Sequence, residues 1–273
     1  MKAFFRKLPP LQWLALLFAA TAGVLQTVCI FRYWHMEENY FPLDRILPSV
    51  AVCFCILSLI AGSIAALTAK PEKLAATIFS PRPLRLTPTI GFAAPAVALL
   101  FYAEKKLAPL TVFFLLAAVI YAILVNVPRF RRYLVPTALL GFATVAACAL
   151  LNAYFYFDAS VEMNSPLKMS LQAGLLASML YFTGELRYLL GTPRPRIFLL
   201  LCSWVISLGS LTAIAFPIAY FLGVLTRGDY GAGALLMLFM VMTAISQTVR
   251  LYNPPVLAEK QPESAPDSER NPT

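Results

Sequence analysis

The residues of this chain that could take part in chemistry are few, and those inside its long apolar blocks are uncharged. Asn152, Gln172 and Ser207 are amide and hydroxyl groups that interrupt such blocks. Groups of this kind form hydrogen bonds between membrane helices, worth about 0.6–2 kcal/mol per contact. They could equally bind a polar part of a solute. The second interpretation predicts an intramembrane polar site between the three apolar segments that carry these residues.

A second group of candidates is charged and lies at or between the ends of the apolar blocks. Arginine binds carboxylates and phosphates through two parallel hydrogen bonds, so clustered arginines suit a docking site for a protein partner or an anionic lipid. The alternative is a set of ion pairs that holds neighbouring loops together. The residues of this predicted docking patch are Arg129, Arg131, Arg132, Glu185, Arg187, Arg194 and Arg196.

Several kinds of catalysis are excluded by residues that the sequence does not contain. His35 is the single histidine, which excludes a haem held by two histidines and a His-Glu-x-x-His zinc site. No glycine-rich phosphate-binding loop is present either. The five cysteines lie in apolar blocks, where they act as small hydrophobic side chains. We therefore expect no cofactor and no metal, and the sequence does not favour an enzyme.

Composition sets the class of structure that must position these residues. Hydrophobic residues make up 60% of the 273 residues, charged residues 13%, and the mean hydropathy is +0.74. The apolar blocks are continuous, and about 20 such residues span a bilayer as a helix. The sequence thus predicts an all-α bundle of eight transmembrane spans embedded in a lipid bilayer. The predicted spans lie near 11–33, 46–68, 88–103, 108–126, 134–156, 168–187, 196–224 and 231–249.

The two ends of the chain extend this prediction. The first apolar run continues to Phe31, which favours an uncleaved first span over a signal peptide. Residues 1–251 are expected to form the transmembrane domain. Residues 252–273 are polar and rich in Pro, Glu and Ser, which predicts a disordered tail.

Most of the 22 Lys and Arg residues fall in every second loop and at the two termini. The positive-inside rule then places both termini in the cytoplasm, which requires an even number of spans. We expect a plasma membrane of the bacterial inner-membrane type. The net charge of +9 is explained by this distribution, so nucleic acid is not an expected partner.

Two Pro-Arg-Pro motifs suggest an internal repeat. Segments 80–83 and 192–195 follow the second and sixth predicted spans, and the next spans contain Pro95 and Pro217. A shift by four spans keeps the orientation, so the pattern predicts a four-plus-four parallel repeat. Chance is the alternative, because Pro and Arg are common in such loops.

Two further patterns concern packing and the opposite side of the membrane. Small residues at four-residue spacing, Ser58, Gly62 and Ala66, predict a close helix contact, as do Gly174 and Ser178. The non-cytoplasmic ends of the spans carry aromatic clusters, which form either an interfacial belt or a vestibule. The acidic residues at the edge of these clusters are Glu37, Glu38, Glu104, Asp158 and Asp229.

Two functional hypotheses remain open. The first is a permease-like carrier of a small neutral or amphipathic solute, supported by the polar groups at depth, the prolines and the repeat. The second is a non-catalytic membrane subunit or scaffold that docks partners or anionic lipids through its basic cytoplasmic loops. The absence of acidic residues from the middle of the predicted spans argues against a proton pump that works through carboxylates.

Overall fold

In a computed structural model, the described part of the chain is helical and contains no strand. The structure describes residues 8–33, 46–75, 87–101, 106–127, 130, 133–162, 165–225 and 227–253. The helices are α2 (Pro10–Tyr33), α3 (Ile46–Thr68), η1 (Pro71–Lys73), α4 (Thr87–Leu100), α5 (Ala108–Leu124), α6 (Leu134–Tyr156), α7 (Pro166–Leu189), α8 (Pro195–Ala213), α9 (Ala215–Phe221) and α10 (Gly228–Tyr252). Every predicted span coincides with a helix or, for 196–224, with the consecutive pair α8 and α9.

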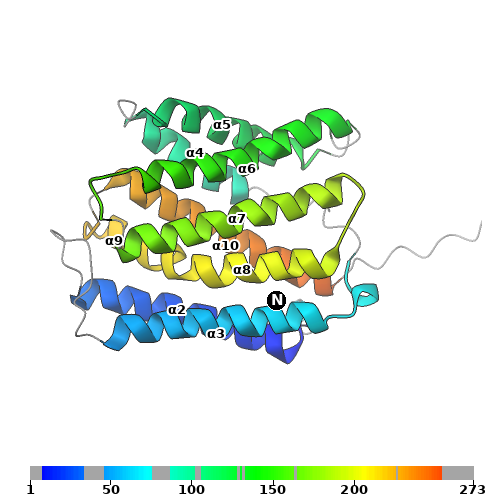
Figure 1. Ribbon diagram of the computed structural model, residues 1–273, viewed down its shortest axis with the longest axis horizontal. Helices are drawn as coiled ribbons and strands as arrows, with labels where there is room; N and C mark the ends of the chain where they lie inside the picture. Colours follow the sequence, from blue (N-terminus) through cyan, green and yellow to red (C-terminus); the bar gives the residue numbers. More distant parts are fainter. Residues whose placement is uncertain are drawn as a thin grey trace, which may run out of the picture.

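The helices lie side by side along the long axis of the molecule (Figure 1). The hairpin of α2 and α3 packs on α8, and α8 packs on α7 and α10. Beyond α7 and α10 lies a third group, in which α4 contacts α10 and α5, and α6 contacts α5 and α7. Thus α8 and α10 occupy the centre of the bundle.

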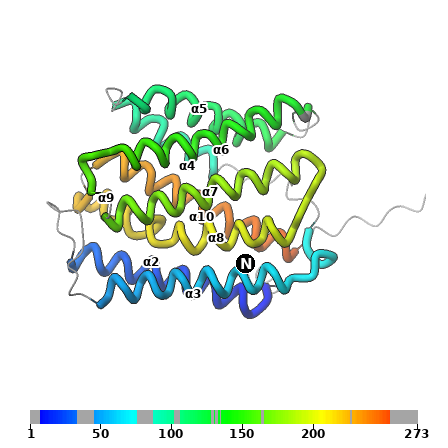
Figure 2. Tube along the Cα trace, in the orientation of Figure 1, coloured from blue at the N-terminus to red at the C-terminus, as the bar shows by residue number. Residues whose placement is uncertain are grey.

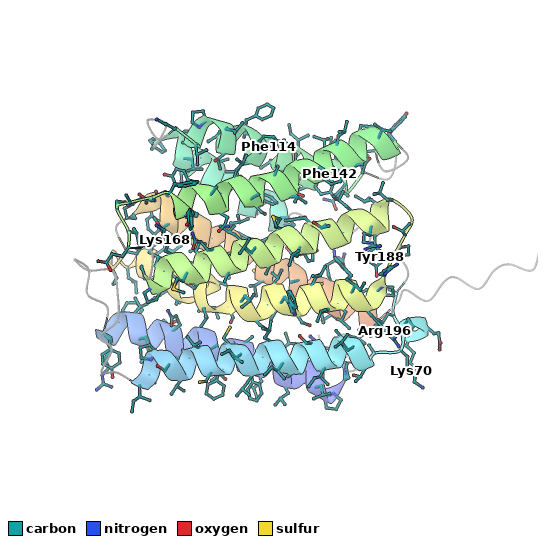
Figure 3. All side chains as sticks on the ribbon, in the orientation of Figure 1. Lys70, Phe114, Phe142, Lys168, Tyr188 and Arg196 are labelled. Carbon is teal, nitrogen blue, oxygen red and sulfur yellow. The ribbon has the colours of Figure 1, made fainter. Side chains whose placement is uncertain are left out.

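The bundle has two ends that are chemically distinct. One end carries α9, residues 157–162, which follow α6, and residues 222–225, which follow α9, and we call it the Arg227 end. The other carries η1 and the turn 190–194, and we call it the Lys70 end (Figure 2). Lys168 lies at the first end, and Lys70 and Arg196 lie at the second (Figure 3). By the distribution of cations, the Lys70 end is the one for which the sequence predicts a cytoplasmic location.

The two prolines inside predicted spans have different effects. Pro217 stands four residues after Ala213, where α8 ends and α9 begins after Ile214. This is the break expected from the clash of the proline ring with the carbonyl four residues before it. In contrast, α4 continues through Pro95, which is buried against the neighbouring helices. The helix is therefore interrupted before Pro217, whereas α4 stays continuous through Pro95.

The predicted small-residue contacts are present. Ser58, Gly62 and Ala66 are all buried, and a Cβ atom added to Gly62 would lie 2.8 Å from the Cβ atom of Ser203 on α8. Likewise, a Cβ atom on Gly174 would lie 2.6 Å from the Cε atom of Met237 on α10. The absence of side chains at these two glycines lets the helix backbones approach closely.

The outer surface of the bundle is apolar. Large hydrophobic side chains face outward along the whole length, including Leu17 at 61% exposure, Phe113 at 65% and Leu139 at 67%. The interior faces of α2 and α3 are lined mainly by Ala, Gly, Ser and Gln. A surface of this kind is stable in lipid rather than in water.

Within the described residues, five segments are long and apolar enough to cross a membrane: Pro10–Tyr33, Ile46–Thr68, Val135–Tyr156, Pro195–Phe221 and Gly228–Tyr252. The helices α4 and α5 are apolar but shorter. The helix α7 is 24 residues long but carries Lys168, Glu185 and Arg187. Together these helices define a multi-pass membrane protein.

Candidate functional site

Two of the predicted intramembrane polar residues lie on neighbouring helices. Asn152 on α6 and Gln172 on α7 stand about 6 Å and about 9 Å from the Arg227 ends of their helices, at a rise of 1.5 Å per residue. The two helices pack against each other. The Asn152 Oδ1 and Gln172 Nε2 atoms are buried and have no hydrogen-bond partner within the described part of the chain. Both side chains therefore have unused hydrogen-bonding capacity.

The third predicted residue, Ser207, lies in a different contact. Its hydroxyl group is 2.7 Å from the hydroxyl group of Ser58 on α3, which in turn donates a hydrogen bond to the Ala15 carbonyl group on α2. The thiol of Cys55 donates to the Ser207 carbonyl oxygen at 3.2 Å. Ser207 thus joins the α2–α3 hairpin to α8, and the structure does not bring it together with Asn152.

The predicted docking patch divides into buried and exposed members. Arg187, Arg194 and Arg196 are exposed, and the Arg196 Nε atom donates to the Ala69 carbonyl oxygen at 2.6 Å. Glu185 is buried and lines a cavity between α4, α5, α7 and α10. The remaining members, Arg129, Arg131 and Arg132, lie outside the described residues.

The cavity beside Glu185 is small and polar on one wall. Its volume is about 30 Å³, enough for one or two water molecules. Gln247 also lines it, and the buried Oε1 atom of Gln247 has no hydrogen-bond partner among the described residues. In this conformation the cavity cannot hold a larger solute.

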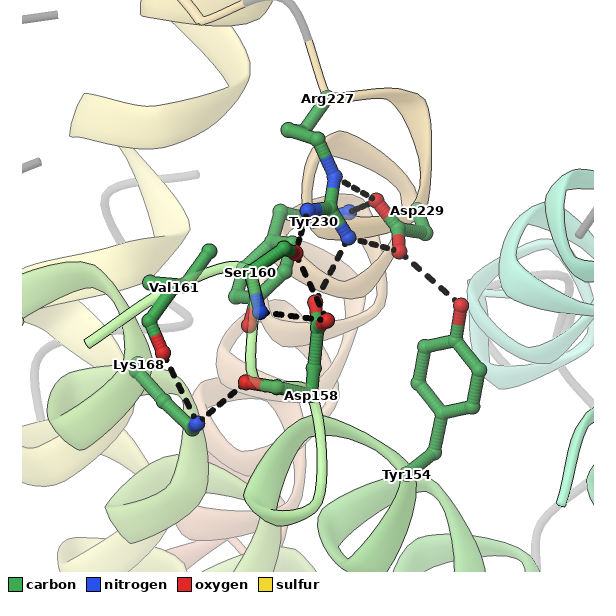
Figure 4. A network of polar contacts seen from close by, with 8 residues as sticks. All are labelled: Tyr154, Asp158, Ser160, Val161, Lys168, Arg227, Asp229 and Tyr230. Atoms are coloured by element: carbon green, nitrogen blue, oxygen red, sulfur yellow. Dashed lines mark hydrogen bonds and ion pairs between the residues drawn. The ribbon is translucent and has the colours of Figure 1, made fainter. Parts of the chain in front are cut away.

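Among the described residues, the densest charged cluster lies at the opposite end of the bundle, around Arg227 (Figure 4). Arg227 Nη2 is 2.7 Å from Asp158 Oδ2 and 2.7 Å from Asp229 Oδ2. The Arg227 Nε atom donates to Asp229 Oδ1 at 3.0 Å, and Nη1 donates to the hydroxyl group of Ser160. Tyr154 donates to Asp229 Oδ2 at 3.0 Å. We call these five residues the Arg227 network.

Lys168 ties the start of α7 to the same region. Its side chain is 1% exposed, and its Nζ atom donates to the carbonyl oxygens of Asp158 at 2.8 Å and Val161 at 3.1 Å. Asp229 is equally buried, at 1% exposure, in the first turn of α10. A carboxylate is favourable there because the backbone N–H groups of a helix start carry partial positive charge. The Arg227 network and Lys168 together therefore connect α6, α7 and α10.

The environment of Asp158 strongly favours its ionised form. Burial alone raises the pKa of this carboxyl group, but hydrogen bonds from Ser160 and Arg227 and the positive charge of Arg227 outweigh burial. The pKa of Asp158 consequently lies well below its usual range. The ionised carboxylate is therefore the form that this environment stabilises.

The sequence places these charged residues at the same predicted side of the membrane without showing that they pair. Asp158 and Asp229 were predicted at the acidic edge of the aromatic clusters, and Lys168 and Arg227 stand at ends of predicted spans on that side. The pairing of Asp158 with Arg227 spans 69 residues. The available signal was that four charged residues stand close to the ends of three helices on the same predicted side.

A large cavity lies on the side of the bundle, between α3 and α7, and residues of α2 and α8 also line it. Its volume is about 640 Å³, and we call it the lateral groove. Its walls are mostly apolar and include Val52, Ile56 and Met169, all of which are also exposed at the outer surface. The groove lies in the half of the bundle nearer the Arg227 end, because α7 contributes its first turns, 166–173.

Polar groups in the lateral groove are concentrated near this end. Ser49 and Ser170 stand within the first turns of α3 and α7, and Gln26 lies deeper, on α2. Cys55, which donates to the Ser207 carbonyl oxygen, also lines the groove. No Asp, Glu, Lys or Arg is among the described residues that line it. The groove can therefore accept a molecule with an uncharged polar part and an apolar part.

Comparison with protein-family models, with curated proteins and with solved structures finds no match to this chain. The class of protein is therefore defined by the fold and composition alone, and it is a multi-pass membrane protein. Among the described residues, no group of three or more His, Cys, Asp or Glu side chains could hold a metal ion.

Proposed function

We propose that this protein is a permease-like carrier that binds a small neutral or amphipathic solute in the lateral groove. The observation that carries the proposal is the groove itself, whose volume of about 640 Å³ lies within the range of about 300–1,000 Å³ for small-molecule sites. Its polar groups near one end and apolar walls elsewhere match the two parts of an amphipathic molecule. A charged occupant is disfavoured, because no charged residue among those described lines the groove.

The opening of the groove favours entry from the bilayer. Val52, Ile56 and Met169 lie at its edge and are exposed on the apolar outer surface. A solute dissolved in the lipid could enter between α3 and α7 without crossing a polar barrier. Its polar group would then face Ser49 and Ser170, near the depth of the lipid head groups.

Asn152, Gln172 and Ser207 have different parts in this proposal. Gln172 precedes Ala173 of the groove wall, and its unpartnered Nε2 atom, like the Oδ1 atom of Asn152, could bind a polar group that passes along α7. Ser207 would act on the groove through Cys55. Substitution of Asn152 or Gln172 by Ala should then reduce transport without lowering the amount of protein in the membrane.

The test uses a monoacylglycerol that carries a photoreactive diazirine in its acyl chain, added to the full-length protein in proteoliposomes. After irradiation, we expect adducts on 48–56 of α3 and 166–173 of α7, located by mass spectrometry. Ala173→Trp should fill the groove and remove most of these adducts. Ala20→Trp is the matched control, because Ala20 is exposed on α2 and does not line the groove.

Transport is measured in the same proteoliposomes with a fluorescent monoacylglycerol. A quencher that cannot cross the membrane is added outside, and the loss of fluorescence reports the movement of the lipid from the inner to the outer leaflet. The wild-type protein and Ala20→Trp should accelerate this movement, and Ala173→Trp should not. Adducts spread evenly over all lipid-facing helices, together with equal rates for the three proteins, would contradict the proposal.

A second function, docking of a partner protein, is favoured by one observation. Arg187 and Arg194 are both exposed at the Lys70 end, and neither makes an ion pair among the described residues. Replacing both by Gln should release a partner that otherwise co-purifies in mild detergent. A wild-type protein that purifies alone under these conditions would count against a subunit or scaffold role.

We also propose that both termini lie in the cytoplasm of a cell with a bacterial-type inner membrane. The proposal is supported by the many cations at the Lys70 end. A reporter fused after Thr273 should be active only as a cytoplasmic fusion. A periplasmic signal would require an odd number of spans.

The four-plus-four repeat stays a prediction about the origin of the chain. The packing of the two halves is equivalent only in part. The pairs α2–α3 and α4–α5 of the first half match the pairs α6–α7 and α8–α10 of the second, but α7 packs along α8 whereas α3 and α4 are not in extended contact. The two halves could still have arisen by duplication of one segment, with the packing of the copies changing afterwards.

A further inference from the structure

A second surface cavity lies at the Lys70 end, whereas the lateral groove lies in the half of the bundle nearer the Arg227 end. It is formed by the start of α2, the end of α3, η1 and Tyr252 of α10, and its volume is about 490 Å³. Lys70 and Lys73 line it, together with Leu11, Ala65 and Leu74. We call it the η1 pocket. It shares no residue with the lateral groove or the Arg227 network.

The backbone around this pocket is held in place from two sides. The Ala75 N–H group donates to the Leu251 carbonyl oxygen of α10 at 2.9 Å. Arg196 of α8 donates to the Ala69 carbonyl oxygen at 2.6 Å. The Lys73 N–H group donates to the Lys70 carbonyl oxygen at 3.0 Å, which places both lysines on one short turn. The two lysines are thus presented from a fixed turn.

The rim of the pocket carries more positive than negative charge among the described residues. Lys70 and Lys73 are exposed, and neither makes an ion pair with another described residue. The guanidinium group of Arg196 lies beside the turn, and Glu72 is the single acidic residue within it. Three cations against one carboxylate favour an anionic ligand.

A buried hydroxyl group points to the same ligand chemistry. The Tyr252 Oη atom is buried and has no hydrogen-bond partner among the described residues, and Tyr252 lines the pocket. A buried hydroxyl group without a partner is costly, and a ligand oxygen would relieve this cost. A phosphate ester supplies such oxygens and the negative charge as well.

The apolar part of the pocket selects the kind of anion. Leu11, Ala65 and Leu74 form its walls, and Leu67 next to it on α3 is 65% exposed on the outer surface. A soluble phosphate would leave this apolar surface unused, whereas the glycerol and first acyl carbons of a lipid would cover it. We propose that the η1 pocket binds an anionic phospholipid, with its phosphate between Lys70, Lys73 and Tyr252.

This inference does not depend on the carrier function. It concerns a different end of the molecule, and it would hold for a carrier, a subunit or a scaffold. Anionic phospholipids are concentrated in the cytoplasmic leaflet, which is where the cation distribution of this chain predicts the Lys70 end.

The test measures phospholipid binding to the purified full-length protein in mild detergent by native mass spectrometry. The probes are phosphatidylglycerol and phosphatidylcholine with identical acyl chains. We expect the wild-type protein to prefer phosphatidylglycerol.

The double variant K70Q/K73Q should lose affinity for phosphatidylglycerol by roughly tenfold or more, since each lysine near an anionic surface contributes about 1 kcal/mol. Y252F should weaken binding of phosphatidylglycerol by about threefold through loss of one hydrogen bond.

The matched control is R187Q/R194Q, which removes two exposed cations from the same end but leaves the η1 pocket intact. This variant should bind phosphatidylglycerol like the wild-type protein. An equal loss of affinity in both double variants would overturn the proposal in favour of diffuse electrostatic attraction. Equal binding of the two lipids by the wild-type protein would also overturn it. Full competition by soluble glycerol phosphate would show that the pocket takes a free phosphate ester instead of a lipid.

Discussion

The two ends of the bundle use the same charged residue types in opposite ways. At the Arg227 end, one arginine contacts two carboxylates and a hydroxyl group, and Lys168 is buried on two carbonyl oxygens. At the Lys70 end, Lys70, Lys73, Arg187 and Arg194 are exposed and make no ion pair within the described structure. The first set of charges is used for holding helices together. The second set remains available for ligands, lipids or partners.

The largest effect is expected from removing the centre of the Arg227 network. Arg227→Ala leaves two carboxylates without their cation, one of them 1% exposed. Breaking a buried ion pair by removing one partner costs about 3–5 kcal/mol. We expect a loss of about 3 kcal/mol or more in unfolding free energy, measured by denaturant unfolding in detergent. Arg194→Ala at the other end should change it by less than about 0.5 kcal/mol. Similar losses in both variants would remove the distinction between the two ends.

A smaller effect is expected from Tyr154→Phe, which removes one hydrogen bond to the buried carboxylate of Asp229. Hydrogen bonds to charged groups contribute about 1.5–3 kcal/mol, so we expect a loss of about 2 kcal/mol in the same unfolding assay. Combined with Arg227→Ala, the loss should be less than additive, because both variants act on Asp229. Strict additivity would show that Tyr154 acts independently of the network.

Acid should weaken the Arg227 end selectively. The pKa of Asp158 in the folded protein lies below its ordinary value of 3.8, so the stability that this group supplies is complete above about pH 4. That contribution is lost as the pH falls from there through the lower pKa of the folded state. The wild-type melting temperature should therefore fall more steeply below pH 4 than that of Asp158→Asn. Parallel pH profiles for the two proteins would contradict the ionised state of Asp158.

The smallest effect on stability is expected at the η1 pocket. In lipid-free detergent, K70Q/K73Q should melt within about 1 °C of the wild-type protein, because both lysines are exposed and unpaired. Phosphatidylglycerol should raise the melting temperature of the wild-type protein but not that of the variant, since a ligand stabilises only the state that binds it. A large loss of stability without lipid would mean that the lysines hold η1 in place.

The sequence was sufficient to predict where the helices lie. All eight predicted spans coincide with helices, because hydrophobicity over about 20 residues is set by local composition. The break near Pro217 was predictable for the same reason, since the clash of a proline ring with the preceding turn is local. The continuity of α4 through Pro95 depends on burial against its neighbours, which the sequence does not specify.

The sites were much less predictable, because they depend on which helices are neighbours. Asn152, Gln172 and Ser207 were predicted to line one polar site, and the contact of Ser207 with Ser58 of α3 was not predictable from the sequence. The lateral groove exists only because α3 and α7 both flank α8, and hydropathy does not report that arrangement. The Arg227 network likewise joins residues that are 69 positions apart. The candidate site residues could be selected by their chemical type. Their contact partners depend on which helices are neighbours in space, and the sequence does not show this directly.

The Arg227 network also has a consequence for the order in which the protein is assembled. Asp158 and Lys168 are synthesised well before Arg227 and Asp229, since 69 residues separate Asp158 from Arg227. Until α10 leaves the ribosome and enters the bilayer, the carboxylate of Asp158 lacks the guanidinium group that neutralises it. The helices that are synthesised first therefore lack this ion pair, and the pair forms only when Arg227 and α10 have been added to the bundle. A chain that stops before Arg227 would leave Asp158 without its ion-pair partner and the bundle without this link between its helices.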